Sequence, residues 1–159
     1  RWSFMHNGQI SGFDRIRRRM EALLSDEIFD ARTGSTDSEL LFLLALEFGL
    51  DRDPHGAVSR AIATIEALSA EICGDVLVRF TAAFSNGETL YAVRYATDSR
   101  PPTLYAAPLG NATSYCLVSE PLNDEVDCWM EVPDGSIVVI GDDGMSVKPF
   151  LVEAPARAA

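Results

Sequence analysis

The sequence contains few residues of the kinds that bind metals or form covalent cross-links. Its 159 residues include three cysteines, Cys73, Cys116 and Cys128, and two histidines, His6 and His55. The cysteines match neither a disulfide framework, which takes an even number, nor the spacing of a metal-binding motif, so we expect buried thiols without partners. Because the histidines lie far apart in the sequence, we predict no transition-metal site and no cofactor.

Long hydrophobic runs and basic residues are also scarce. No apolar run approaches the length of a transmembrane helix, so we expect no membrane partner. Lys and Arg number 13 against 24 Asp and Glu, a formal net charge of −11. This charge argues against a nucleic-acid partner, because phosphate binding needs clustered cations. The one basic cluster faces away from an apolar helical stripe at Phe13, Ile16 and Met20, and it is interpreted as a solvated helix face: Arg15, Arg17, Arg18 and Arg19.

The hydrophobic pattern predicts helices in the first half of the chain. A helix is expected from Ser11, as N-cap, to about Ser25. A second helix, with apolar residues on nearly all sides, is expected over residues 36–48 and can end at Gly49. A third begins at Asp53-Pro54, an N-cap followed by proline at the first helical position.

After residue 74 the pattern changes to the period of two that is typical of strands. Residues 76–84 and 89–95 form an antiparallel hairpin around Asn86-Gly87, which needs no functional explanation. Shorter strands are expected near residue 104 and over 115–118, 129–132, 136–140 and 146–151, with turns at Asp134-Gly135 and Asp143-Gly144. With 47% hydrophobic and 23% charged residues, this order predicts one globular domain of the α+β class.

Two short motifs carry the functional interpretation. The first, Phe4-Met5-His6-Asn7-Gly8-Gln9, contains an Asn-Gly pair that alone favours a type I′ turn. The apolar alternation before it favours instead a strand that ends at Asn7-Gly8 beside a crevice. The second motif, Gly34-Ser35-Thr36-Asp37-Ser38-Glu39, matches a helix capping box with an acidic first turn. Capping and substrate binding are compatible roles for it.

In this order the two motifs resemble the glutamine-site motifs of class II glutamine amidotransferases, which are N-terminal nucleophile hydrolases. The resemblance implies that the side-chain amide of Asn7 and the backbone N–H of Gly8 form an oxyanion hole. It also implies that Asp37, with Thr36 beside it, binds the ammonium group of the substrate, while His6 supports the site from behind. These roles require the Asn7 amide and the Asp37 carboxylate to converge on one cavity.

Later segments resemble the branch of this family that acts without an attached synthase and includes γ-glutamyl amide hydrolases. They are Arg94-Tyr95-Ala96, Pro101-Pro102-Thr103-Leu104-Tyr105, Ser119-Glu120-Pro121-Leu122 and Val132-Pro133-Asp134-Gly135. The resemblance implies a four-layer αββα sandwich and a cytoplasmic enzyme that cleaves glutamine or a γ-glutamyl amide through a cysteinyl thioester. Residues 1–153 would be the C-terminal portion of that single domain, and residues 154–159 a frayed tail.

The sequence departs from the family at one point: the family's nucleophile is a cysteine at the mature N-terminus, and residue 1 here is Arg. We therefore expect the nucleophile and the carboxylate-binding arginine to lie upstream, with a fold incomplete at its N-terminus. The internal cysteines cannot replace the nucleophile, because the mechanism uses the nucleophile's own α-amino group as base. These residues alone are expected to be inactive and to self-associate through uncovered sheet edges. A non-catalytic binding or regulatory module, or a structural domain with coincidental motifs, remains an alternative.

Overall fold

The computed structural model describes residues 1–110, 114–123 and 128–152. The chain divides into two compact units. The sheet unit contains Arg1–Gly8 and the described residues of Arg79–Phe150, and the helical unit contains Gln9–Val78 together with Leu151 and Val152. The expected tail, residues 154–159, lies outside the described residues. Helices and antiparallel strands occur in one chain, so the predicted α+β class is confirmed.

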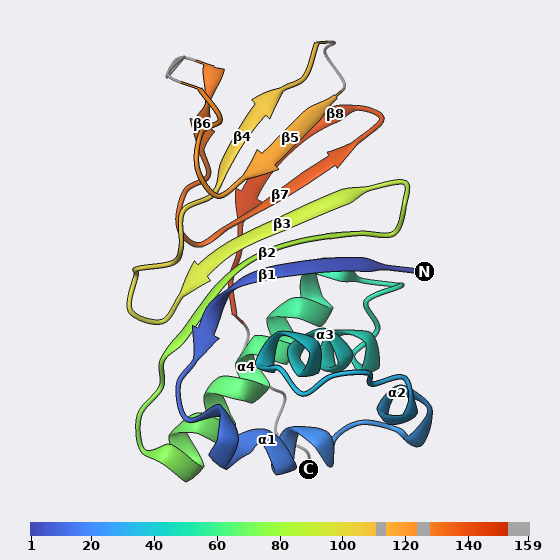
Figure 1. Ribbon diagram of the computed structural model, residues 1–159, viewed down its shortest axis with the longest axis vertical. Helices are drawn as coiled ribbons and strands as arrows, with labels where there is room; N and C mark the ends of the chain where they lie inside the picture. The colour runs from blue at the N-terminus through green and yellow to red at the C-terminus, as the bar shows by residue number, and fades with distance from the viewer. Residues whose placement is uncertain (111–113, 124–127, 153–159) are drawn as a thin grey trace. The chain divides into compact units, whose positions relative to one another are not determined.

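The helical unit consists of α1 (Phe13–Glu21), α2 (Asp26–Asp30), α3 (Asp37–Glu47) and α4 (Pro54–Cys73), shown in Figure 1. α3 packs against α1 and α4, which explains why its leucines continue nearly all round the helix and why most of them are buried, namely Leu40, Leu41, Leu43 and Leu44. α4 begins as predicted: the Asp53 carboxylate accepts a hydrogen bond from the Gly56 N–H (2.9 Å), and Pro54 follows the cap.

The start of α1 differs from the prediction. The N-cap is Gly12 and not Ser11, whose N–H donates to the Leu77 carbonyl oxygen (2.9 Å). The chain enters the helix through Gly12, whose φ is +70°, and a Cβ there would lie 2.6 Å from the Cys73 Sγ. Only glycine adopts this conformation and tolerates this contact without strain. The helix ends at Glu21 rather than near residue 25, and the short α2 was not predicted.

The sheet unit contains two antiparallel sheets. The larger has the strand order β1-β2-β3-β7-β8, and the smaller has the order β5-β4-β6 (Figure 1). The bounds of the larger sheet are β1 (Ser3–Ile10), β2 (Val78–Ser85), β3 (Leu90–Ala96), β7 (Ser136–Gly141) and β8 (Gly144–Pro149). Those of the smaller are β4 (Tyr105–Pro108), β5 (Tyr115–Val118) and β6 (Met130–Glu131). β1 extends two residues beyond the unit's boundary at Gly8.

The predicted hairpin between β2 and β3 is confirmed, with Ser85 opposite Leu90 and Phe84 opposite Tyr91. The Asn86 side chain accepts hydrogen bonds from the N–H groups of Glu88 and Thr89, which fixes the turn. The last predicted turn is shifted by one residue. It consists of Asp142 and Asp143, because Gly144, at φ +93°, already pairs with Gly141 in the ladder.

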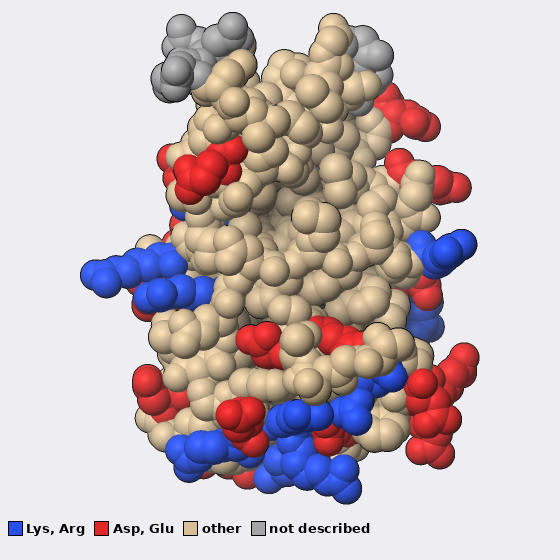
Figure 2. Space-filling model, viewed as in Figure 1, with Lys and Arg blue, Asp and Glu red and all other residues tan. Residues whose placement is uncertain are grey.

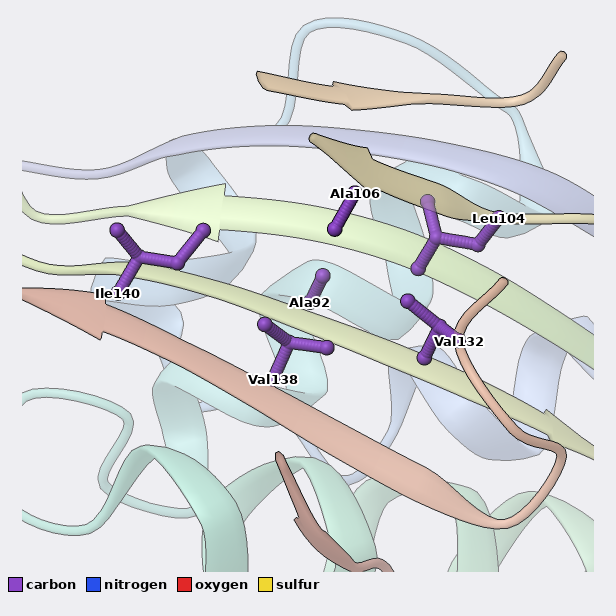
Figure 3. Packing of buried hydrophobic residues seen from close by; sticks show 6 residues of the cluster. All are labelled: Ala92, Leu104, Ala106, Val132, Val138 and Ile140. Atoms are coloured by element: carbon purple, nitrogen blue, oxygen red, sulfur yellow. The ribbon is translucent and has the colours of Figure 1, made fainter. Parts of the chain in front are cut away.

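Side chains from both sheets meet in one buried cluster (Figure 3). Ala92, Val138 and Ile140 come from β3 and β7, and Leu104, Ala106 and Val132 come from the smaller sheet and the segments beside it. The sheets therefore share an apolar face, as the sequence alternation of β3 and β7 predicts. The order of all four layers in an αββα sandwich stays a prediction.

The outer strands of the larger sheet are β1 and β8. Met5 on β1 is 74% exposed, and Val147 on β8 is 38% exposed. Edge strands with exposed apolar side chains favour pairing with another chain. Self-association stays a prediction.

The cysteines are less buried than expected: Cys73 and Cys116 are half-buried and Cys128 is exposed. Among the described residues, no helix combines the length and the apolar composition needed to cross a lipid bilayer.

Candidate functional site

The Asn7-Gly8 pair lies inside an unbroken strand. β1 continues past the pair to Ile10 and neighbours β2 in the larger sheet. The type I′ turn is therefore excluded, and the expected position at the end of the strand is also wrong. Because the pair is part of a sheet, its backbone is held by its neighbours rather than exposed in a loop.

Asn7 lines a cavity of about 190 Å³ within the sheet unit. The cavity walls come from β1, β2, the segment before β4, and β5 with the residue after it. The lining residues are Met5, His6, Asn7, Thr81, Ala82, Ala83, Thr103, Leu104, Leu117, Val118 and Ser119. None of them is Asp, Glu, Lys or Arg, and over the sheet unit the surface in Figure 2 is hollowed and carries few charged side chains. A mainly apolar cavity with a few polar groups is typical of a small-molecule site.

The contribution of β2 to this cavity was missed by sequence reasoning, which treated the hairpin as purely structural. Thr81, Ala82 and Ala83 line the cavity. Thr81 and Ala83 lie two residues apart and therefore stand on the same face of β2, and the small side chain of Ala83 was the available signal of space there.

His6 packs against aromatic rings and the backbone of β2. Its ring centroid lies 5.0 Å from that of Phe80, and its Nε2 lies 3.4 Å from the Arg79 carbonyl oxygen. The ring centroid of Phe4 lies 6.4 Å from that of His6. These contacts are those of a supporting residue, although the functional role of His6 stays a prediction.

Packing against β2 explains why residue 8 is glycine, which the sequence alone did not reveal. A Cβ at this position would lie 2.0 Å from the Arg79 carbonyl oxygen and 2.4 Å from the His6 Nε2. Real side chains do not tolerate such distances, and backbone oxygen cannot move aside cheaply. Glycine is therefore required here by the close approach of β2, whatever the N–H of Gly8 binds.

Thr36 and Asp37 begin α3 in the helical unit. The Thr36 Oγ1 accepts a hydrogen bond from the Glu39 N–H (3.2 Å), so the predicted N-cap is confirmed. Asp37 is half-buried, and its Oδ1 accepts a hydrogen bond from the Ser38 N–H (2.8 Å). A carboxylate in the first turn is stabilised by the helix dipole.

The other half of the capping box works differently from the usual pattern. The Glu39 carboxylate reaches the preceding loop, where it accepts hydrogen bonds from the N–H groups of Thr33 (2.7 Å) and Gly34 (2.7 Å). The bond from the Thr33 N–H is the main cause that lowers the pKa of Glu39 below its usual 4.5. The loop that leads to Asp37 is thus fastened to the helix that Asp37 begins.

A second carboxylate holds the same loop at its start. Glu21 at the end of α1 binds Arg32 and, at 2.9 Å, the Arg17 Nε. The hydrogen bond from Arg17 lowers the pKa of Glu21, and Arg32 lowers it further. Arg32 also lies over the ring of Phe29, 4.9 Å from the centroid. The segment before Thr36 is therefore anchored on both sides.

The predicted site residues are divided between the two units. His6, Asn7 and Gly8 belong to the sheet unit, and Thr36 and Asp37 belong to the helical unit. Their convergence on one cavity stays a prediction. Within the described ranges, no group of three or more His, Cys, Asp or Glu side chains is arranged to hold a metal ion.

The chain is similar to known glutamine-dependent proteins. It is 44% identical to a glutamine aminotransferase class-II domain protein from Silicibacter pomeroyi, with a TM-score of 0.89, over 96% of this chain and 68% of that structure. It is 29% identical to the probable glutamine amidotransferase DUG3 of Saccharomyces cerevisiae over 190 aligned positions and 94% of this chain. No protein-family model matches.

A more distant structure shares the fold. Glutamine phosphoribosylpyrophosphate amidotransferase from B. subtilis is 16% identical, with a TM-score of 0.57, over 96% of this chain and 30% of its own. The chain spans 52% of the yeast protein's length. The activity of the whole protein is therefore a proposal.

The close approach at Gly8 predicts a large difference between two glycine substitutions in the same sheet. Gly8→Ala should lower the free energy of unfolding by about 1–3 kcal/mol, because the new Cβ overpacks against the Arg79 carbonyl. Gly141→Ala is the matched control, since a Cβ there meets only the Thr89 Oγ1, at 3.9 Å. Denaturant unfolding measures both, and equal stability of the two variants would contradict the assigned contact.

The bonds to Glu39 predict a pH dependence of stability. Because the folded-state pKa of Glu39 is below 4.5, its contribution is complete above that pH and is lost as the pH falls through the folded pKa. Glu39→Gln should lower the free energy of unfolding by about 1 kcal/mol at pH 7 and flatten its decline as the pH falls below 4.5. Glu88→Gln, at an exposed turn position, should leave the profile of urea midpoints against pH unchanged. If the urea midpoints of Glu39→Gln followed those of the wild type at every pH, the stabilising role of the Glu39 carboxylate would be excluded.

Proposed function

This chain belongs to the class II glutamine amidotransferase domain family, and we propose that it forms part of an amidohydrolase acting on glutamine or a γ-glutamyl amide. The observation that carries the proposal is the position of Asn7. Asn7 lines a mainly apolar cavity and stands on a strand whose backbone is held in a sheet. A polar amide beside such a cavity suits the recognition of a developing negative charge.

The proposed chemistry begins when a cysteine thiolate attacks the amide carbon of the substrate. The carbonyl oxygen becomes an alkoxide, and the Asn7 side-chain amide and the Gly8 N–H donate hydrogen bonds to it. Each such donor stabilises the transition state by about 2.7–4 kcal/mol in other enzymes. The C–N bond then breaks, the amine leaves with a proton, and a thioester remains. Water hydrolyses the thioester to a carboxylate and restores the thiol.

The nucleophile in this proposal belongs to the whole protein and is not one of the three cysteines of this sequence. None of the residues that line the cavity is a cysteine. In the family mechanism the base is the α-amino group of the nucleophile itself, which an internal cysteine does not offer. If the natural coding sequence opens with Met-Cys, the enzyme is favoured; any other residue there favours a non-catalytic binding module.

Asp37 is proposed to bind the α-ammonium group of the γ-glutamyl moiety, with Thr36 beside it. The carboxylate is held at the N-terminus of α3, and the loop before it is fastened by Glu39 and Glu21. A fixed carboxylate pairs with an ammonium group without losing side-chain freedom on binding. The proposal requires the two units to bring Asp37 to the cavity that Asn7 lines.

The role of Asn7 is tested by Asn7→Ala in the intact protein. We expect kcat for glutamine hydrolysis to fall about 100- to 1,000-fold, because a donor to the transition-state oxyanion is lost. KM should change little, since the substrate carbonyl carries no full charge. Gln9→Ala is the matched control, an exposed position on the same strand. Retention of wild-type kcat in Asn7→Ala would refute the oxyanion-hole role.

The role of Asp37 is tested by Asp37→Asn, which keeps the shape of the side chain and removes its charge. We expect KM for glutamine to rise about tenfold or more, because a charge-assisted bond to the ammonium group is lost. The effect on kcat should be smaller, since the ammonium group is remote from the reacting amide. Asp30→Asn, exposed at the end of α2, is the control. An unaltered KM in Asp37→Asn would remove Asp37 from the site.

A further inference from the structure

Arg94 on β3 is the one charged residue that is buried among those the structure describes, with 8% of its surface exposed. Its Nε donates to the Pro102 carbonyl oxygen (3.1 Å), and its Nη1 donates to the Val132 carbonyl oxygen (2.5 Å) and to the Glu131 Oε1 (2.8 Å). Because a buried charge is costly unless it is well paired, this arrangement needs a physical reason.

The ion pair with Glu131 does not explain why Arg94 is buried. The side chain of Glu131 is 53% exposed, and a pair with a solvated carboxylate contributes little. The two backbone carbonyls are the distinctive partners. They belong to two segments that flank the smaller sheet, one before β4 and one after β6. The planar guanidinium of arginine directs several donors at once, so one side chain can hold both segments.

The cross-strand neighbour of Arg94 binds the same carbonyl. Thr81 on β2 lies directly opposite Arg94 in the ladder, so both side chains stand on one face of the sheet. The Thr81 Oγ1 donates to the Pro102 carbonyl oxygen at 2.8 Å. Pro102 is therefore held by two donors from adjacent strands.

The segment held in this way forms part of the cavity beside Asn7. Thr103 and Leu104 follow Pro102 and line the cavity, as does Thr81 itself. The Leu104 carbonyl accepts a hydrogen bond from the Val132 N–H (2.9 Å), and the Thr103 Oγ1 donates to the Glu120 Oε1 (3.0 Å). Each segment that sequence reasoning treated as a mark of the family branch thus contributes to this one network.

We infer that Arg94 is a positioning residue for substrate binding: with Thr81 it fixes the Pro102–Leu104 wall of the cavity that Asn7 lines. This inference rests on the proposed function of that cavity. The wall contacts substrate equally before and during the reaction, so its displacement weakens binding without removing a catalytic group.

The kinetic test uses Arg94→Lys in the intact protein. The ammonium group keeps the charge but cannot direct donors to both carbonyls. We expect KM for glutamine to rise about tenfold, with kcat changed less than about threefold. A merely structural role would lower the amount of active protein, and hence the apparent kcat, and would leave KM unchanged. That result would overturn the inference.

Two further variants sharpen the test. Thr81→Val removes the second donor to the Pro102 carbonyl while keeping the side chain's shape. Since both donors act on one atom, the effects of Arg94→Lys and Thr81→Val on KM should not multiply in the double variant. Asp98→Asn is the control: it disrupts the ion pair between Arg79 on β2 and Asp98 just after β3 (2.7 Å), and neither residue lines the cavity. Its KM should equal that of the wild type.

Amide hydrogen exchange distinguishes failure of this inference from failure of the proposed function, because it needs no turnover. In Arg94→Lys the Val132 amide, which donates to Leu104, should exchange about tenfold faster, while the amides of Ala92 and Val138 keep their rates. If the wild type hydrolyses no glutamine but this local change is present, the proposed function fails and the positioning of the wall stands. An equal change at all three amides, or none, overturns the inference.

Discussion

The packing of two sheets through one shared face is the constraint on which the sheet unit depends. Alanines at positions 92 and 106 allow the backbones to approach, and the larger side chains of Leu104, Val132 and Val138 fill the space around them. Arg94 follows Ala92 by two residues and therefore stands on the same face of β3. This charged side chain at the margin of the apolar layer binds the backbone carbonyls of Pro102 and Val132, beside the two ends of the smaller sheet's strands β4 and β6.

The cavity is a consequence of the same face. Thr81 and Ala83 are the partners of Arg94 and Ala92 across the ladder, and they are among the residues that line it. At β3 and β7, the side chains of the buried cluster fill the space between the sheets. Beside β1 and β2, short side chains leave space. Asn7 thus lines a pocket whose other walls come from β2, β5 and the segment before β4.

Local chemistry explains how well the sequence predicted the elements. Asp53 before Pro54 and Thr36 before Glu39 are caps that act within one turn, and both helices begin where these residues predict. The hairpin at Asn86-Gly87 is equally local. At Asn7-Gly8 the sequence correctly predicted a strand but ended it too early, and at Ser11 it misplaced the helix cap, because both segments contact distant residues, Arg79 and Leu77. A dipeptide that favours a turn is overridden when a neighbouring strand pairs with it.

The amino-acid sequence by itself determined the N-caps of α3 and α4, the strand periodicity, the α+β class and the family, since each is a property of neighbouring residues or of motifs in a fixed order. Only the tertiary structure decided why residue 8 must be glycine, which segments enclose the cavity beside Asn7, and what the buried Arg94 holds. These features arise between residues far apart along the chain, such as Gly8 and Arg79 or Arg94 and Val132. Their contacts depend on the packing and register of whole sheets, which no local pattern encodes.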